Sequence, residues 1–221
     1  MFMATTTFTQ VPTSLASVTV EVADLEAARR FYSAFGVDAY IQLRASEAHR
    51  AGFRGFTLAL TVSGPATVDG FVAAAVDAGA TVLKPAVKSL WGYGGVVQAP
   101  DGTIWKIATS AKKDTKPATR RIDEVVLLLG VEDVKATKQF YVDQGLTVGK
   151  SFGGKYAEFL PGGSSLVKLA LYKRRALARD LGVVDDDAGS HHLVLGSTAG
   201  TFTDPDGFVW EATASLDSAQ S

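Results

Sequence analysis

Hydrophobic and polar positions follow one order in two separate parts of the chain. Residues 17–22 (SVTVEV) alternate and are rich in β-branched side chains, which is typical of a strand with one buried face. Asp24 can then cap a helix whose apolar residues recur every three or four positions until Gly36, a residue suited to end it. Residues 125–145 repeat this order, with an apolar strand, Asp133 as the cap, a helix and a closing glycine. The pattern therefore predicts a strand–helix unit that occurs twice.

Two pairs of motifs recur at nearly the same distance. Asp24–Tyr32 (DLEAARRFY) resembles Asp133–Tyr141 (DVKATKQFY), and Ala99–Lys106 (APDGTIWK) resembles Asp204–Glu211 (DPDGFVWE). The offsets are 140 − 31 = 109 and 210 − 105 = 105. Two different motifs with similar offsets predict a tandem duplication. Each Pro-Asp-Gly predicts a β-hairpin, because proline presets the turn and glycine supplies a positive φ.

A polar, basic stretch separates the two copies. Residues 110–121 (SAKKDTKPATRR) lack any apolar period and contain a proline, which favours a solvated linker. We therefore predict a first domain at 1–110, a linker at 111–121 and a second domain at 122–221 with a shortened second module.

The copies differ between these landmarks. The first has a second amphipathic helix at 67–79 and an aromatic, glycine-rich loop at 89–95. The second has added strands at 155–160 and 165–172 and a basic amphipathic helix at 174–181.

Composition narrows the classes of function. The 221 residues include 22 basic and 23 acidic side chains, no cysteine and three histidines. These counts exclude disulfides, zinc fingers and a cysteine nucleophile, and they give no basic footprint for nucleic acid. No stretch reaches the roughly 20 apolar residues that span a membrane, and the start of the chain does not look like a secretory signal. A cytoplasmic location is the resulting expectation.

The duplicated module resembles the vicinal oxygen chelate superfamily, which includes glyoxalase I, the bleomycin-resistance proteins and the extradiol dioxygenases. The residues that carry the resemblance are Val18–Tyr32 with Ala99–Lys106, and Val125–Tyr141 with Asp204–Glu211. The resemblance implies an α+β fold of tandem βαβββ-type modules, with curved mixed sheets forming a cup and helices outside. It also implies that a homodimer is an arrangement open to this chain.

Enzymes of this superfamily hold one divalent metal through side chains on the first, fourth and final strands of their modules. In the first copy these positions fall on Ser17 and Lys106. Neither residue suits a hard divalent cation, and a lysine ammonium would repel one.

The second copy leaves two alternatives open. The resemblance places Glu124, or Val126 if the helix is the anchor, at the first-strand position. His192 and Glu211 could complete a set of three ligands, whereas Lys168 stands where a fourth-strand carboxylate belongs. We expect no metal, and the alternative is one divalent ion held by Glu124, His192 and Glu211. His191 is adjacent to His192, and because strand alternation lets only one of the two face the cup, we choose His192. The third histidine, His49, lies in a polar stretch and is expected at the surface.

The aromatic loop is the stronger candidate for function. Trp91 and Tyr93 could place two flat faces over the cup, and the neighbouring glycines would let a ligand approach the backbone. Trp105 and Trp210 occupy matching strand positions and can either fill the core or stack on a ligand. Lys106 and Lys168 could pair with an anionic group.

Three hypotheses for function follow. The favoured one is a glyoxalase- or bleomycin-resistance-like protein that binds a hydrophobic or aromatic small molecule in a sheet-lined cup without a metal. The second is a metal-dependent lyase, isomerase or dioxygenase, and the third is an interaction module without a small ligand. Whether the protein is an enzyme stays open at this point.

Overall fold

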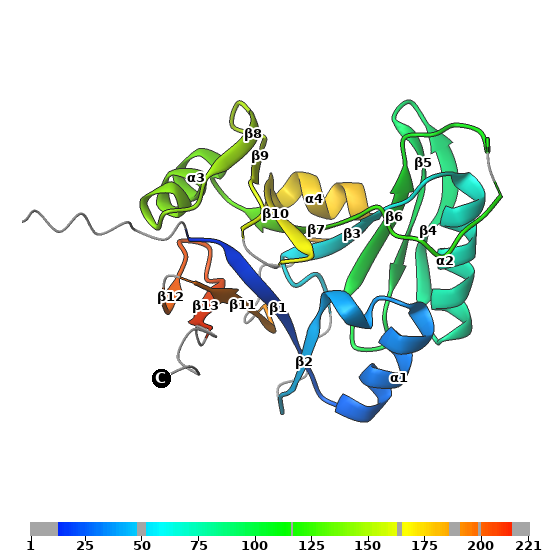
Figure 1. The fold of residues 1–221 in the computed structure, drawn as a ribbon, viewed down its shortest axis with the longest axis horizontal. Helices are drawn as coiled ribbons and strands as arrows, with labels where there is room; N and C mark the ends of the chain where they lie inside the picture. The colour runs from blue at the N-terminus through cyan, green and yellow to red at the C-terminus, as the bar shows by residue number, and fades with distance from the viewer. Residues whose placement is uncertain are drawn as a thin grey trace, which may run out of the picture.

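The computed structural model describes residues 13–47, 52–115, 117–162, 165–185, 191–198 and 200–213. These residues form two mixed β-sheets and four α-helices (Figure 1). Among them, no helix is both long and apolar enough to cross a membrane. His49 and the first 12 residues lie outside the described part of the chain.

The larger sheet has eight strands. Their order across the sheet is β4 (Thr81–Ser89), β5 (Gly92–Gln98), β6 (Ile104–Thr109), β3 (Phe56–Thr61), β7 (Glu124–Val131), β10 (Val167–Lys173), β9 (Tyr156–Phe159) and β8 (Val148–Phe152). The central strands β3 and β7 are antiparallel, while β6 runs parallel to β3 and β10 runs parallel to β7. The same pattern of strand directions therefore occurs on both sides of the β3–β7 pair.

The smaller sheet joins the beginning and the end of the described chain. Its order is β12 (Phe202–Thr203), β13 (Val209–Ala212), β11 (Leu193–Ser197), β1 (Leu15–Val22) and β2 (Gln42–Ala45). In the antiparallel β1–β11 pair, Val20 lies opposite Leu193. Each sheet thus contains strands from both 1–110 and 122–221, and the division at 111–121 stays a prediction from the sequence.

The predicted helix caps are present. The helices are α1 (Leu25–Phe35), α2 (Pro65–Asp77), α3 (Val134–Asp143) and α4 (Arg174–Leu181), with a short 3₁₀ helix at Asp38–Tyr40. The Asp24 carboxylate accepts from the backbone N–H of Ala27 at 2.9 Å, and Asp133 caps α3 in the same way. Gly36 ends α1 in the left-handed conformation, with φ at +85°.

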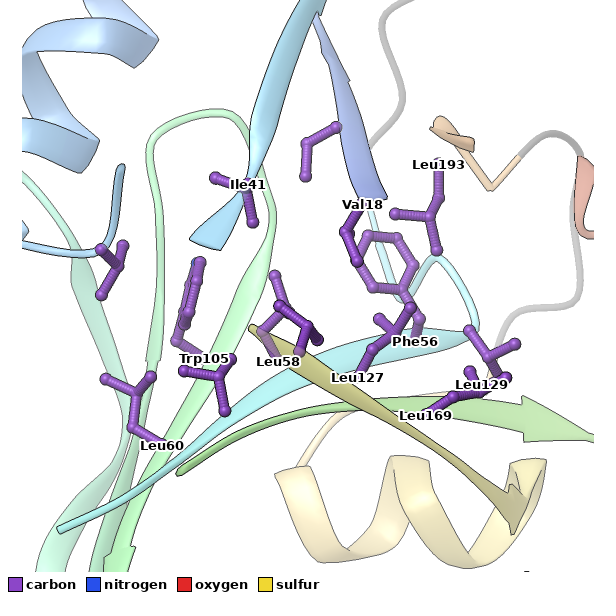
Figure 2. Close-up of a cluster of buried hydrophobic side chains, with 14 of the residues drawn as sticks. Val18, Ile41, Phe56, Leu58, Leu60, Trp105, Leu127, Leu129, Leu169 and Leu193 are labelled. Atoms are coloured by element: carbon purple, nitrogen blue, oxygen red, sulfur yellow. The ribbon is translucent and has the colours of Figure 1, made fainter. Parts of the chain in front are cut away.

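The main core lies between the two sheets. Figure 2 shows Phe56, Leu58 and Leu127 of the larger sheet pointing toward Val18 and Leu193 of the smaller one. The outer helices add to this core through aromatic rings. Phe35 of α1 packs on Trp105 of β6 with ring centres 5.4 Å apart, and Tyr141 of α3 packs on Phe159 of β9 at 5.5 Å.

Helix α4 lies on the opposite, concave face of the larger sheet. Figure 1 shows it between the arm formed by β4, β5 and β6 and the arm formed by β8, β9 and β10. Leu177, Ala178 and Leu181 are buried there against Val96 of β5 and Ile104 of β6. The expectation that the helices lie outside the cup therefore holds for α1, α2 and α3. Helix α4 instead fills part of the cup with its apolar face.

Candidate ligand-binding site

One row of side chains crosses the four central strands of the larger sheet. Lys106 of β6 is in register with Ala59 of β3, which lies opposite Val126 of β7, and Val126 is in register with Lys168 of β10. Neighbours in register project from the same face of a sheet. Leu58, Trp105 and Leu127, one residue away, face the main core, so the row faces the concave side that carries α4.

The Lys106 side chain is bonded to the end of α4. Its Nζ lies 2.5 Å from Oδ2 of Asp180, and both side chains are partly exposed. Lys84 of β4 reaches the same helix end, where its Nζ donates to the carbonyl oxygens of Arg179 at 3.2 Å and Asp180 at 2.5 Å. Two lysines from the sheet therefore hold the last turn of α4.

Lys168 has separate partners at the other end of the row. Its Nζ pairs with Oε2 of Glu124 and lies 4.0 Å from Oε1 of Glu158. The hydrogen bond with Glu124 raises the pKa of Lys168, against the smaller opposing effect of its own burial. Two carboxylates thus surround this one ammonium group.

A pocket of about 300 Å³ remains open on the concave face beside α4. Gly94 and Ala108, which are paired across β5 and β6, lie among its lining residues together with Lys106. Trp91, Val87 and Asp180 also line it. The pocket therefore joins an apolar side to a charged side.

The glycines of this segment serve the sheet itself. A Cβ at Gly94 would come 2.8 Å from the carbonyl oxygen of Ile107. Gly92 has φ at +138°, and a Cβ there would overlap the Thr109 carbonyl oxygen. These contacts explain the glycines through the close approach of neighbouring strands, and the interpretation in which they open the backbone to a ligand stays a prediction.

Trp91 and Tyr93 do not form a pair of facing rings. Trp91 lies in the turn between β4 and β5, and it is 88% exposed. Tyr93 donates through its hydroxyl to Oδ1 of Asp69 on α2 at 2.8 Å, and its ring packs against the main core. This hydrogen bond raises the pKa of Tyr93. Because α2 and α4 pack on opposite faces of the sheet, the Tyr93 hydroxyl points away from α4, although Tyr93 is among the residues that line the pocket.

The other two tryptophans belong to the core. Trp105 and Trp210 are both fully buried. Trp210 packs against Tyr141 with ring centres 5.3 Å apart, and it stacks on Phe202 at 5.2 Å. Of the two uses that the sequence left open for these residues, the structure shows core packing, and neither lines the pocket.

The three alternative metal ligands are not brought together. Glu124 pairs with Lys168 on the larger sheet, whereas Glu211 lies on β13 of the smaller one. Among the described residues, no three His, Asp or Glu side chains form a cluster that could hold a metal. The row of Lys106, Ala59, Val126 and Lys168 offers no carboxylate or imidazole ligand either. The residues present therefore do not fit the metal site that the resemblance implies.

An arginine occupies the space between the carboxylates of the smaller sheet. Nη1 of Arg44 donates to both oxygens of Glu211, at 3.0 and 3.1 Å, and its Nη2 donates to Oε1 of Glu21 at 2.9 Å. These hydrogen bonds, first with Glu21 and then with Glu211, raise the pKa of Arg44. Nδ1 of the buried His192 lies 3.7 Å from Oε2 of Glu21. His192 and Glu211 thus belong to a cluster centred on a guanidinium group.

His191 faces a different part of the fold from His192. Its ring stacks on Phe208 with centres 3.8 Å apart, and its nitrogens contact the carbonyl oxygens of Arg54 at 2.6 Å and Asp206 at 2.9 Å. This histidine joins the segment before β3 to the last hairpin, so its contacts are structural.

A second pocket, of about 210 Å³, lies at the start of α1. Its polar lining includes Asp24 and Asp101, which already have structural partners. Asp24 caps α1, and Asp101 accepts a hydrogen bond from Tyr32 at 2.6 Å. We therefore place the candidate site at the pocket beside α4.

Sequence reasoning missed the partners of the charged residues. Asp180, Arg44 and Glu21 were not singled out, although each contacts a predicted site residue. Lys84, which contacts the end of α4, was not singled out either. All four look like ordinary surface charges in the sequence.

Comparisons with known proteins agree on the fold. Glyoxalase I from Zea mays superposes with a TM-score of 0.54 at 12% identity, covering 90% of this chain and 91% of that chain. A Bacillus subtilis protein provisionally named a dioxygenase gives a TM-score of 0.54 at 9% identity, covering 90% of this chain and 84% of that chain. No family model matches the sequence, and no curated protein matches it. At these identities the likeness shows the fold alone.

Proposed function

We propose that this chain, which has the vicinal oxygen chelate fold, binds a hydrophobic or aromatic small molecule without a metal ion, in the manner of a glyoxalase- or bleomycin-resistance-like binding protein. The observation that carries this proposal is the pocket of about 300 Å³ beside α4, where an exposed tryptophan and a lysine line one cavity. Ligand pockets typically start at about this volume and combine apolar walls with few polar groups.

The apolar side of the pocket suits a flat ligand. Trp91 presents nearly its whole indole ring to solvent, and Val87 beside it is 56% exposed. A ligand that covers these surfaces would remove apolar area from water, and this contributes a favourable free energy of roughly 25 cal/mol per Å². An aromatic ring would add a favourable stacking geometry with the indole. These features favour an aromatic body over a small polar metabolite.

The charged side of the pocket supports binding rather than catalysis. Its charged residues Lys84, Lys106 and Asp180 are bonded to one another or to the end of α4. A general base or a nucleophile needs a poised proton acceptor within reach of a substrate. The proposal therefore assigns these groups to ligand orientation and assigns no reaction to them.

The proposed ligand binds without a metal. The register row that crosses the cup carries two ammonium groups and two small apolar side chains, none of which is a metal ligand. Elemental analysis of protein purified without chelators tests this part. A stoichiometric divalent metal that is lost in Glu211→Ala would overturn it and would favour the metal-dependent lyase, isomerase or dioxygenase.

The test of ligand binding uses N-phenylnaphthylamine, an uncharged aromatic probe whose fluorescence rises in apolar sites. We expect Trp91→Ser to weaken its binding by about tenfold, which corresponds to about 1.4 kcal/mol and is typical of a contributing binding-site side chain. Leu90→Ser is the matched control, because Leu90 is 85% exposed and adjacent in sequence but does not line the pocket. Equal binding by Trp91→Ser and the unmodified protein would reject this pocket as the site.

Two further expectations accompany this proposal. We propose a cytoplasmic location, based on the absence of cysteine in the sequence. We also propose that a homodimer is one arrangement open to this chain, which light scattering on the purified protein can test.

A further inference from the structure

The pocket beside α4 contains an internal anion at the place where a ligand's anion would bind. We propose that the pocket selects aromatic molecules carrying a carboxylate or sulfonate, and that Asp180 competes with this group for Lys106. The inference rests on the proposed function and adds a ligand class and a means of regulation to it. It begins from the ion pair between Lys106 and Asp180, whose charged atoms are 2.5 Å apart.

The ion pair is accessible enough to exchange partners. The Lys106 side chain is 33% exposed and that of Asp180 is 45% exposed. Pairs at such positions contribute little net stability, commonly up to about 1 kcal/mol. An incoming anion can therefore replace the Asp180 carboxylate on the Lys106 ammonium while Asp180 turns to water. No covalent bond forms or breaks, and the charge on Lys106 stays compensated throughout.

The position of Asp180 within α4 is unfavourable for the helix. It lies in the last turn, where the helix dipole disfavours a negative charge. Lys84 already satisfies the backbone carbonyl of Asp180 and that of Arg179. Helix stability therefore does not explain an aspartate here, whereas its contact with Lys106 does.

The charge balance of the pocket favours an anion. Its charged lining residues are Lys84, Lys106 and Asp180, so two ammonium groups face one carboxylate. The other lysine of the register row has the opposite balance, because both Glu124 and Glu158 surround Lys168. The two ends of the row are thus distinct, and only the end at Lys106 suits a negatively charged group.

The geometry also sets the order of groups in the ligand. Lys106 and Asp180 line the pocket from β6 and α4, while Trp91 and Val87 belong to the β4–β5 hairpin. A ligand that reaches both must carry its negative charge at one end of a flat apolar body. Anilinonaphthalene sulfonate has this form, and N-phenylnaphthylamine is the same molecule without the sulfonate.

The experiment compares these two probes on the intact folded protein by fluorescence titration at low salt. Asp180→Asn should tighten binding of the sulfonate probe about three- to fivefold, the range expected when a weak competing ion pair is removed. Binding of the uncharged probe should change less, so that the affinity ratio of the two probes rises. Lys106→Met should weaken binding of the sulfonate probe more than binding of the uncharged probe.

Lys168→Met is the matched control, because Lys168 lies in the same register row but outside the pocket. It should leave the affinities of both probes unchanged. Circular dichroism and the melting temperature of each variant confirm that α4 stays folded, so that a change in affinity reports on the pocket.

The outcomes separate the two proposals. If the uncharged probe is insensitive to Trp91→Ser, the proposed binding function itself fails. If that probe binds at the pocket but Asp180→Asn leaves the affinity ratio of the two probes unchanged, only the competition by Asp180 is wrong. A loss of affinity for the sulfonate probe in Lys168→Met equal to that in Lys106→Met would show that a general charge effect, not the Lys106–Asp180 pair, controls anion binding.

Discussion

The hydroxyl of Tyr141 donates a hydrogen bond of 2.5 Å to Oδ2 of Asp204, and both residues are buried. The pair joins α3 to the last hairpin. The other Asp204 oxygen, Oδ1, accepts from the backbone N–H groups of Asp206 at 3.0 Å and Phe208 at 2.8 Å. Tyr32 of α1 makes a similar bond with Asp101 at 2.6 Å. In each part of the chain, a helix tyrosine is thus bonded to an aspartate of a hairpin.

Tyr141→Phe should destabilise the protein by about 1–3 kcal/mol, because it leaves one oxygen of the buried Asp204 without its donor. Urea unfolding followed by circular dichroism measures this change. Tyr93→Phe is the matched control, since its hydroxyl bonds to Asp69 at an exposed site, and it should cost less than about 1 kcal/mol. Equal losses in the two variants would contradict the importance of burial.

The stability of the protein should carry a pH dependence from Asp204. Desolvation by burial raises the pKa of this carboxyl above its ordinary value of 3.8, and this effect exceeds the opposing hydrogen bonds. The folded state therefore holds the proton more tightly than the unfolded state. Its contribution to stability is complete below the unfolded pKa and is lost as pH rises through the folded pKa. Relative to Asp204→Asn, the unmodified protein should lose stability as pH rises above the ordinary carboxyl pKa of 3.8.

Asp133 provides the control of opposite sign. Backbone N–H groups of Ala136 and Lys135 lower the pKa of this capping carboxylate. Its contribution is therefore present above the unfolded pKa and lost as pH falls through the folded pKa. The unmodified protein should lose stability as pH falls because Asp133 becomes protonated. Asp133→Asn should not show this loss. If the pH dependence of stability removed by Asp204→Asn had the same sign as that removed by Asp133→Asn, one of the two assigned causes would be wrong.

Replacing each of two glycines with alanine should have opposite effects on the stability of the protein. Gly92→Ala should cost about 2 kcal/mol or more, because φ at +138° is strained for alanine and the new Cβ meets the Thr109 carbonyl. Gly70→Ala should stabilise by about 0.5–1 kcal/mol, because Gly70 lies inside α2 and a Cβ there has nothing within 4 Å. Thermal unfolding of both variants tests the pair.

The apolar face of α4 should contribute strongly to stability. Leu181→Ala should cost about 2–5 kcal/mol, since Leu181 is fully buried against the concave face. Val184→Ala, at a side chain that is 79% exposed shortly after the helix, should change stability by less than about 0.5 kcal/mol. A small effect of Leu181→Ala in urea unfolding would show that α4 is only loosely attached.

Local features of the fold could be predicted because their causes lie within a few residues. The caps at Asp24 and Asp133 and the stop at Gly36 follow from side-chain and backbone chemistry near each helix end. The pairing of β1 with β11 could not be predicted in this way. Alternation identifies a buried strand face but does not specify which distant strand completes its hydrogen bonds.

The site could be predicted only in part for the same reason. Trp91 and Lys106 line one pocket as the aromatic-loop hypothesis requires. Trp91 and Tyr93 are two positions apart and would face the same side if both lay in one strand. Trp91 lies in a turn, however, where this alternation does not apply, and so the direction of Tyr93 was missed. Asp180 reads as a solvated charge on a short helix until the position of α4 inside the cup is known.

The interleaving of the two sheets has a consequence for synthesis on the ribosome. All eight strands of the larger sheet have been made once the chain reaches Lys173, whereas β1 must wait for β11 to complete the smaller sheet. During that interval the nascent chain exposes an unpaired strand edge and an apolar surface that the finished molecule covers. Chaperone capture and aggregation should therefore be concentrated in the last stage of translation.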